Sequence, residues 1–527
     1  MARTERRTKL LTLGAACVAL FLAMLDNTVI AVALPAIQRH FDATVSGLQW
    51  AFTGYTLFYA ALLLTGGTLG DLFGRKAVFL AGLGIFVAGS LVSALSPSLG
   101  VLVLGRIIQG SGAAAFLPGS LSLVTHAFTG RRERAQAIGL WAGVSGIGIA
   151  AGPALGGLLV DSLGWQSIFY ITVPIGLAAI AIASAVVEES KDPQGRTLDL
   201  PGQVLAIAAL GAVTFALIES SSYGWTSPVT LGLLGLAAVL QAVFLWVEWH
   251  SPSPMLELRF FRNATFSTGV GVAALSNFAM FGALFFLTLY IQNVQGYSAW
   301  GMGVRALPLT LAIIVTAPFS GRLAGRIGSR LPMTAGLVLA GAGMLLLLRL
   351  TPSTSYAQIW WNLAVIGFGM GLVATPMTAA VMGAVPKARS GMASATTGAS
   401  REIGGLFGVA LLGALVSTSF AAGLSDRIRD LSLSATGKAL VLAIARHGGR
   451  AAAVALPSGI GPAHLQEIVG QAFVAAMLPA IAVAGAILLI GAGLAYWLVP
   501  ADVPEDENVP EAPSARAGGG PHCAEER

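Results

Sequence analysis

Charge is scarce in this chain: only 10% of its 527 residues are Asp, Glu, Lys or Arg. An average soluble domain carries roughly 25% charged residues, so 30 basic and 24 acidic side chains are too few to coat a soluble body of 53.8 kDa. This scarcity excludes a soluble enzyme and a nucleic-acid-binding domain. It also excludes a disordered chain, because disorder needs low hydrophobicity and high net charge, whereas 55% of these residues are hydrophobic.

Cysteine is nearly absent too. Cys17 lies in an apolar run and Cys523 in a polar tail, so the two provide no disulfide framework. The sequence G-x-x-x-x-G-K-[ST] does not occur, which argues against ATP hydrolysis. No cluster of side chains has the spacing of metal ligands. The sequence therefore predicts a protein that is not an enzyme and that needs no cofactor or metal.

Long apolar runs are what the chain has in quantity. A membrane-spanning helix needs about 20 apolar residues, whereas outer-membrane barrels show short alternating segments. The runs therefore predict an all-α integral membrane protein with fourteen spans, whose approximate limits are 10–33, 48–70, 78–95, 101–125, 135–160, 166–187, 201–219, 229–249, 265–292, 303–324, 332–350, 357–382, 394–420 and 471–499.

The distribution of basic residues predicts the orientation. Lys and Arg occur in the loops after every second span, whereas the short loops 96–100, 161–165, 220–228, 293–300 and 351–356 have none. Arg39 lies in the first outer loop, and the outer loop 421–470 contains several basic residues, but long loops are largely exempt from the charge rule. Cytoplasmic loops are enriched in Lys and Arg, so fourteen spans place both termini in the cytoplasm and the protein in the cytoplasmic membrane. The basic N-terminus runs into an apolar segment without a convincing cleavage site, which indicates an uncleaved first span.

An internal repeat organises the spans. At a constant offset of 254 residues, seven positions match without a gap, namely Ile37 with Ile291, Gln38 with Gln292, Gly47 with Gly301, Gly67 with Gly321, Leu69 with Leu323, Gly74 with Gly328, and Lys76 with Arg330. The first match follows span 1 in one copy and span 9 in the other. Two six-helix halves around a central cavity are the parallel-repeat plan of a transporter.

The repeat divides the chain into four predicted parts. The N-terminal half covers 1–190, a two-helix insert 191–260, and the C-terminal half 261–500. The C-terminal half includes an outer loop with some helix at 421–470. Residues 501–527 are rich in Pro, Gly and Glu and are predicted to be a disordered cytoplasmic tail.

The inner loop after span 2 reads G-T-L-G-D-L-F-G-R-K over residues 67–76. Gly74 permits a tight turn at a helix end, and Asp71, Arg75 and Lys76 can form charge-assisted hydrogen bonds. With Gly67, this loop resembles the signature of the major facilitator superfamily. The resemblance implies that Asp71 and Arg75 latch the two halves on the cytoplasmic side.

Three further motifs narrow the resemblance. Span 1 carries L-D-N-T-V-I-A-V-A-L-P, span 4 carries R-I-I-Q-G-S-G, and span 5 carries G-I-A-A-G-P-A-L-G-G. Together with fourteen spans, they resemble the drug:proton antiporters of the EmrB/QacA type. The resemblance implies the major facilitator fold with two inserted central helices. It also implies efflux of an amphipathic or cationic drug in exchange for protons. The protein is expected to work as a monomer.

Asp26 is an acid inside the membrane, where such residues are rare and usually functional. It lies about 10 Å from the outer end of span 1, and Arg106 lies about 8 Å from the outer start of span 4, at 1.5 Å per residue. The two residues can therefore pair across the bundle, and a carboxylate near Arg releases its proton more readily. The resemblance assigns both to proton coupling; the alternative for Asp26 is a structural acid near the outer interface.

Small residues recur in span 5. Gly148, Gly152, Gly156 and Gly157 are predicted to form one face for close helix packing, and Pro153 can kink the helix. In the family, antiporters carry this pattern and uptake symporters generally lack it. The alternative is a plain packing face.

The sequence leaves open the roles of several side chains in the second half. Glu402 follows Arg401 in span 13, where the family commonly has Gln. It is a second protonatable site, a contact for cationic drugs, or a partner of Arg401 at the inner boundary. A group of aromatic and Met side chains either lines an apolar cavity or faces lipid, with lipid favoured for any single one: Phe278, Met280, Phe281, Phe285 and Phe286.

The function of the whole protein also has alternatives. Besides efflux, they are proton-coupled uptake of a metabolite and a membrane sensor or scaffold without transport. The span 5 pattern and the fourteen spans argue against uptake, and the absence of a soluble signalling domain argues against a sensor. A composition rich in Ala, Gly and Arg also fits an antibiotic producer that protects itself.

Overall fold

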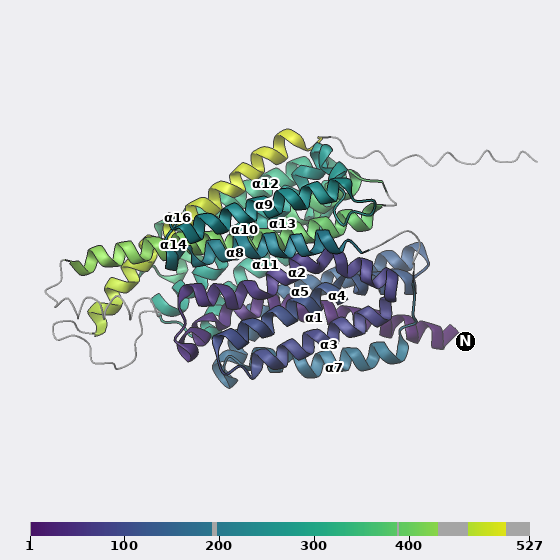
Figure 1. Cartoon of the computed structure of the whole chain (residues 1–527), viewed down its shortest axis with the longest axis horizontal. Coiled ribbons are helices and arrows are strands. Elements are labelled where there is room, and N and C mark those ends of the chain that lie inside the picture. Colours follow the sequence, from purple (N-terminus) through teal and green to yellow (C-terminus); the bar gives the residue numbers. More distant parts are fainter. Residues whose placement is uncertain (1, 192–197, 387–388, 430–461, 502–527) are drawn as a thin grey trace, which may run out of the picture.

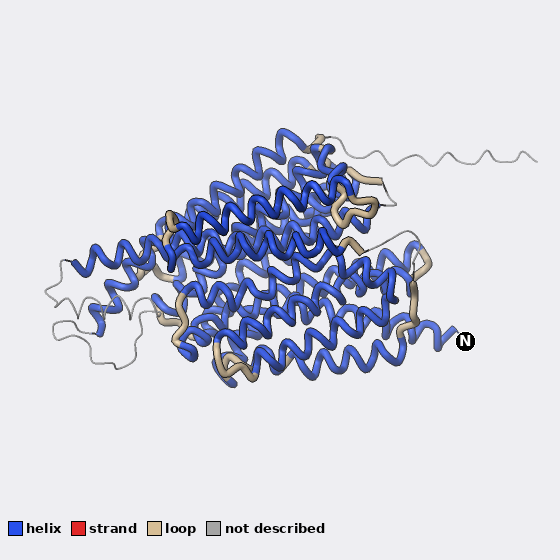
Figure 2. Tube along the Cα trace, in the orientation of Figure 1, coloured by secondary structure: helices blue, strands red, loops and turns tan. Residues whose placement is uncertain are grey.

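The computed structural model describes residues 2–191, 198–386, 389–429 and 462–501, and within these ranges every regular element is a helix (Figures 1 and 2). Fourteen of the helical segments are long and apolar enough to cross a membrane, as predicted. The first bundle comprises α1 (Ala2–Phe41), α2 (Val45–Phe73), α3 (Arg75–Ala94), α4 (Leu99–Ala127), α5 (Arg131–Leu163), α6 (Ser167–Tyr170) and α7 (Thr172–Val186).

The remaining helices form an insert and a second bundle. The insert is α8 (Leu200–Tyr223) and α9 (Pro228–His250). The second bundle comprises α10 (Ala264–Leu289), the π-helix η2 (Tyr290–Val294), α11 (Ala299–Ile327), α12 (Arg330–Leu346), α13 (Tyr356–Gly383), α14 (Ser390–Arg429) and α16 (Pro462–Leu498). The short helix η1 (Leu258–Arg262) precedes α10, and the short helix η3 (Leu347–Arg349) follows α12.

Both described ends of the chain lie on one side of the molecule, as an even number of spans requires (Figure 1). We call this side the basic end, because the loops with Arg75 and Lys76 also lie there, and we call the opposite side the far end. Exposed tryptophans lie near both ends of the molecule, with Trp246 and Trp497 toward the basic end and Trp300 toward the far end. Such aromatic side chains gather at membrane–water interfaces.

The repeat found in the sequence is visible in α2 and α11. Each helix has 29 residues, and the bounds Val45–Phe73 and Ala299–Ile327 differ by the same 254 positions. Each is capped in the same way, because Thr44 and Ser298 accept a hydrogen bond from the amide three residues on. Each ends at a glycine with positive φ, at 114° for Gly74 and 78° for Gly328. The two copies therefore share their local structure.

The insert lies over the seam between α2 and α14, since α8 packs against both. Most polar contacts of α8 are with α2. The side-chain amide of Gln203 donates to the Ala61 carbonyl at 3.0 Å, and the Trp50 indole donates to the Glu219 carboxylate at 3.0 Å. Toward α14, Trp225 donates to Thr418 at 3.2 Å. α9 packs on α8 and exposes apolar side chains along its outer face. The insert is thus joined mainly to the first bundle.

Hydrogen bonds between the two bundles are concentrated at the far end. The side-chain amides of Gln49 and Gln292 donate to the carbonyls of Val409 and Val32, at 2.7 and 2.9 Å. The five residues 290–294 that follow α10 form the π-helix η2, whose Asn293 donates to the Gln38 side chain at 3.0 Å. Side-chain amides of both bundles thus reach across the interface.

Asp161, at the end of α5, accepts from the first two amides of α11, those of Ala299 at 3.2 Å and Trp300 at 2.8 Å. An acid at a helix N-terminus is favourable because the helix dipole is positive there. Toward the basic end, by contrast, Gly139, Gly143 and Gly146 of α5 face no atom within 4 Å. The bundles are therefore joined at the far end and diverge toward the basic end (Figure 1).

The predicted outer loop 421–470 is partly helical within the described residues. α14 continues to Arg429 and α16 already begins at Pro462, so helix occupies both ends of that segment. Past the apolar span, Arg429 pairs with Asp426 at 3.2 Å on the same face of α14, which favours continued helix. Residues 430–461 and the predicted tail from residue 502 lie outside the described residues.

A candidate coupling site between α1 and α4

The predicted pair of Asp26 and Arg106 forms across the first bundle. Asp26 lies on α1 and Arg106 on α4, both side chains are fully buried, and Arg106 Nη1 lies 2.5 Å from Asp26 Oδ2. Whether Asp26 couples protons or is a structural acid near the outer interface stays a prediction, because both roles are compatible with this burial. A buried pair is costly to desolvate, so its presence in the membrane core points to a function.

Gln109 completes the pair. Its Nε2 donates to the second carboxylate oxygen of Asp26 at 3.2 Å and to Ser90 of α3 at 2.8 Å, while its Oε1 accepts from Arg106 at 3.0 Å. Both oxygens of Asp26 therefore have a donor, and three helices hold the site together. Sequence reasoning missed Gln109, although the motif R-I-I-Q-G places it one helical turn after Arg106, on the same face.

Aromatic rings enclose the guanidinium. Its central carbon lies 4.6 Å from the centre of the Tyr55 ring and 5.8 Å from that of Phe169. Such contacts favour a desolvated cation. Within the described part of the chain, the Tyr55 hydroxyl and Arg106 Nε are buried without a hydrogen-bond partner. The site therefore holds two unused polar groups beside its ion pair.

Glu402 lies on α14 of the second bundle and is turned toward this site. Only 7% of it is exposed, and its carboxyl group is in hydrogen-bonding contact with Asn27, the neighbour of Asp26. Tyr55 and Tyr59 of α2 lie within its electrostatic reach. Among the described ion pairs none joins Glu402 to Arg401. Glu402 of the second bundle thus contacts the residue of α1 that directly follows Asp26.

The loop signature at the basic end folds into a compact cap. Arg75 donates to Asp71 Oδ1 through Nε at 3.1 Å and Nη2 at 2.9 Å, and Lys76 Nζ donates to the Ser184 carbonyl at 2.8 Å. Glu189 accepts from the amides of Lys76 and Ala77, which start α3. These contacts all lie within the first bundle, so the latch between the halves stays a prediction.

Gly67 and Gly74 have different places in this signature. A Cβ on Gly67 would be in ordinary contact with Pro118 of α4, at 3.8 Å. At Gly74, the positive φ of 114° and the Glu189 carboxylate, 2.7 Å from an added Cβ, both exclude a side chain. Gly325 and Ser329 stand at the repeat positions of Asp71 and Arg75, so the second copy lacks this ion pair.

The glycines of α5 serve two interfaces rather than the single face predicted. Gly148, Gly152 and Gly156 pack against α1, where an added Cβ would overlap Met24, Thr28 and Val29. Gly157 points instead to α11, where an added Cβ would lie 2.7 Å from the Cα of Trp300. Adjacent residues differ by about 100° around a helix, so Gly157 cannot share the face of Gly156.

Pro153 belongs to the second interface. Its carbonyl faces Gly303 of α11, where an added Cβ would overlap it. The motif of span 5 therefore joins α5 to α1 on one side and to the second bundle on the other.

We expect Gly152→Leu to abolish transport while the protein still reaches the membrane, because the larger side chain would separate α5 from α1 beside Thr28. Drug resistance and membrane abundance should be measured together. Gly143→Leu is the matched control, since Gly143 of the same helix faces open space. Near-normal resistance of Gly152→Leu would show that the glycine spacing is incidental.

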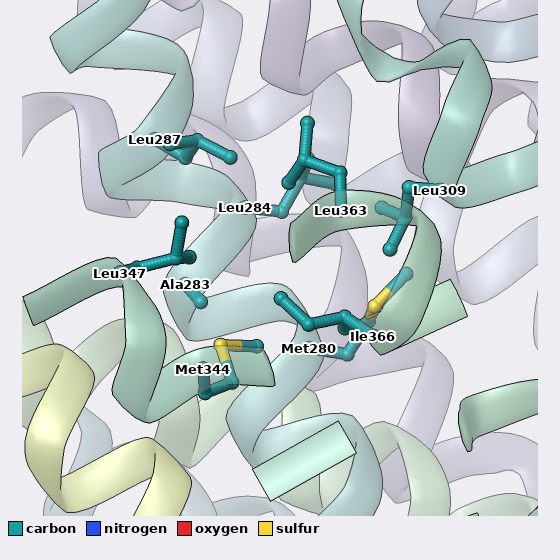
Figure 3. Close-up of a pocket in the computed structure, with 9 residues that line it drawn as sticks. All are labelled: Met280, Ala283, Leu284, Leu287, Leu309, Met344, Leu347, Leu363 and Ile366. Carbon is teal, nitrogen blue, oxygen red and sulfur yellow. The ribbon is translucent and has the colours of Figure 1, made fainter. Parts of the chain in front are cut away.

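The aromatic and Met residues of α10 are mostly turned inward rather than toward lipid. Phe278, Phe285 and Phe286 are buried, at 8, 0 and 1% exposure. Met280 lines a small apolar cavity of about 20 Å³ inside the second bundle (Figure 3). The other lining residues come from α10, α11, α12, η3 and α13, and are Ala283, Leu284, Leu287, Leu309, Met344, Leu347, Leu363 and Ile366.

Fourteen candidate membrane helices, twelve in two repeated bundles and two in the insert, together with an ion pair buried in one bundle, define a membrane transporter. The chain belongs to the Major Facilitator Superfamily, whose family model matches residues 16–409. The superfamily predicted from the loop signature is therefore confirmed, as is the all-helical fold with two repeated bundles and two inserted helices.

Curated relatives agree with this assignment. The chain is 41% identical over 422 residues to the multidrug resistance protein Stp of Mycobacterium tuberculosis, covering 80% of this chain and 78% of that protein. It is 34% identical over 518 residues to the tetracenomycin C resistance and export protein of Streptomyces glaucescens, covering 97% and 95%.

The fold is similar to the crystal structure of a bacterial homologue of the human lysosomal transporter Spinster, solved in an inward-facing, unoccupied conformation. The TM-score is 0.65 at 20% identity, with 93% of this chain and 96% of that chain covered. At this identity the likeness concerns the fold alone.

Proposed function

We propose that the protein exports amphipathic or cationic drugs across the cytoplasmic membrane in exchange for protons. The buried pair of Asp26 and Arg106 carries the proposal, because an acid held in the membrane core is suited to bind and release a proton. The relatives support the cargo, since their names refer to multidrug resistance and to export of tetracenomycin C. Protection of an antibiotic producer against its own product fits the same names.

The coupling step follows from the donors around Asp26. In this conformation Arg106 and Gln109 occupy both carboxylate oxygens and stabilise the charged form. A shift of α1 against α4 removes these donors, and the carboxylate then takes up a proton instead. Asp26 thereby alternates between an ion pair and a protonated acid as the helices move.

We propose that the Glu402 carboxylate binds either a cationic substrate or a second proton. Because it contacts Asn27 from the opposite bundle, a change of charge at Glu402 acts directly on α1. A cationic drug or a proton would each neutralise its carboxylate. The two possibilities are alternatives, and the first of them places the drug between the bundles.

The proposed moving parts are the N-terminal half over 1–190 and the C-terminal half over 261–500. The insert 191–260 is proposed to move with the N-terminal half, because α8 is hydrogen-bonded mainly to α2. Rocking of the halves would break the contacts at the far end and close the basic end. Each chain contains both halves, so a monomer is sufficient for this cycle.

The proposed topology places the basic end in the cytoplasm. Reporter fusions at Met1 and after Pro500 should both report a cytoplasmic location, and an epitope tag within residues 430–461 should be accessible from outside intact cells. The physical reason is the concentration of Lys and Arg in the loops of the basic end. A reporter after Pro500 that is active outside the cell would contradict the orientation and the pairing of the halves.

A drug-susceptibility panel in an efflux-deficient bacterial host tests the function. Expression should raise the inhibitory concentrations of some amphipathic drugs and lower the accumulation of a fluorescent cation such as ethidium. In vesicles, the same substrate should cause proton movement in the opposite direction. Increased accumulation on expression, with protons moving in the same direction as substrate, would instead indicate uptake by symport.

A further inference from the structure

Two carboxyl groups meet at the basic end of the insert. Asp199 precedes α8, and Glu248 lies in the last turn of α9 with only 2% of it exposed. The two side chains are in hydrogen-bonding reach of each other. Gly202 lies beside them: a Cβ there would stand 2.6 Å from Glu248 Oε1 and 2.9 Å from Asp199 Oδ2.

Within the described residues, two of the four carboxylate oxygens of this pair have a hydrogen-bond donor and two have none. Asp199 Oδ1 accepts from the Gly202 amide at 2.9 Å, and Glu248 Oε2 accepts from the Leu256 amide at 2.9 Å. The backbone amide of Met255 is also in hydrogen-bonding reach of the Glu248 carboxyl group. Asp199 Oδ2 and Glu248 Oε1 are buried and have no donor within the described ranges. These two free oxygens are the ones next to Gly202. Two acceptors that face each other in a buried place are both satisfied by one proton between them.

We propose that Asp199 and Glu248 share one proton and form a pH-sensitive clasp between α8 and α9. With the shared proton, the pair carries one negative charge and all four oxygens are hydrogen-bonded. Without it, two carboxylates repel each other at short range, which like charges in a buried site strongly disfavour. The proposal does not depend on drug export or on Asp26.

Other charged groups leave this arrangement intact. Asp199 is the titratable group that acts on Glu248. α2 and α14 pack against α8 and carry charged side chains of their own. Asp71 of α2 is paired with Arg75, and on α14 Arg401 is followed by Glu402, which contacts Asn27. The titratable and charged side chains at the end of α9 and in the linker after it are His250, Glu257, Arg259 and Arg262. The His250 ring contacts the Trp246 carbonyl. The Glu257 carboxylate lies 4.0 Å from Arg259 and 3.7 Å from Arg389.

The clasp lies where the insert is connected to both bundles. The chain reaches Asp199 from the first bundle and leaves Glu248 toward the second. Glu248 also holds the start of that second linker, through Leu256. Glu257 and Asn263 then tie the linker to the second bundle, through Arg389 at 3.7 Å and the Ala384 carbonyl at 3.4 Å. Loss of the shared proton would therefore loosen the path that joins the halves.

Thermal unfolding of the full-length protein in detergent tests the clasp. A shared proton stabilises the folded state at low pH, and this stability is lost as rising pH removes the proton. Between about pH 6 and about pH 9, the Tm of the wild type should fall by about 2–4 °C more than that of Glu248→Gln. The Gln amide donates permanently to Asp199, so this variant needs no shared proton. Asp199→Asn should behave alike, because Asn keeps the helix cap.

Glu257→Gln is the matched control, since it removes a carboxylate of the same region that lies outside the pair. It should follow the wild-type pH profile. Infrared spectra at neutral pH should show a protonated carboxyl band that disappears in Glu248→Gln. Parallel Tm profiles for the wild type and Glu248→Gln, or an unchanged carboxyl band in that variant, would overturn the proposal.

Discussion

Asp26→Asn is expected to eliminate proton-driven efflux while the protein remains folded and in the membrane. Asn has nearly the same shape and still accepts from Arg106, so the contacts between α1 and α4 persist. It cannot bind a proton on and off, however. Each coupled charge contributes about 2.3 kcal/mol per 100 mV of membrane potential. Its loss lowers the drug gradient that can be maintained by roughly 50-fold.

The measurement is substrate-induced proton release in vesicles, together with efflux of ethidium. Asp426→Asn is the matched control, because it makes the same chemical change at an exposed acid of α14. We expect the control to retain wild-type rates and Asp26→Asn to release protons at background level. If Asp26→Asn exchanged protons for substrate at the normal rate, coupling would lie elsewhere, and Glu402 would be the next residue to test.

Arg106→Leu is expected to destabilise the folded protein strongly. It would leave the Asp26 carboxylate fully buried with no positive partner, and breaking a buried pair in this way costs about 3–5 kcal/mol. The side-chain oxygen of Gln109 would also lose the shorter of its two hydrogen bonds and keep only the one from Ser93, at 3.5 Å. We expect a lower Tm in detergent and a smaller yield of monodisperse protein.

The double variant Asp26→Asn with Arg106→Leu separates stability from transport. It removes the stranded charge, so most of the lost Tm and yield should return, whereas proton release should not. Such a non-additive result is the signature of two residues that interact directly. Equal stability of Arg106→Leu and the wild type would contradict the proposed pair energetics, and would indicate that Asp26 does not carry a charge in the resting protein.

Sequence reasoning predicts positions along the helices well and directions around them poorly. Counting 1.5 Å per residue from the span ends places Asp26 and Arg106 at one depth, and the structure joins them at 2.5 Å. The repeat likewise anticipates that α2 and α11 share their bounds. Depth depends on chain length and the thickness of the bilayer, and both are legible in a single sequence.

The errors concern which side of a helix meets which neighbour. Glycine spacing assigns Gly157 to the face of Gly156, and hydrophobicity favours lipid for Phe285 and Phe286, although both are buried. In a membrane protein the interior and the lipid are both apolar, so hydrophobicity does not distinguish them. Asp161 escapes sequence reasoning for a related reason, because its partners are backbone amides of α11 in the other bundle.

The closure at the far end sets how often an empty transporter would turn over. The hydrogen bonds that the side-chain amides of Gln49, Gln292 and Asn293 donate, and the two that Asp161 accepts, must break before that end opens. At about 1 kcal/mol net for each bond, the cost is on the order of 5 kcal/mol. The opposite conformation is then populated in roughly one molecule in several thousand. Only a ligand that binds the rare state more tightly can shift this balance. If the protein exchanges drugs for protons as proposed, idle cycling and leakage of protons into the cell would therefore be rare between transport events.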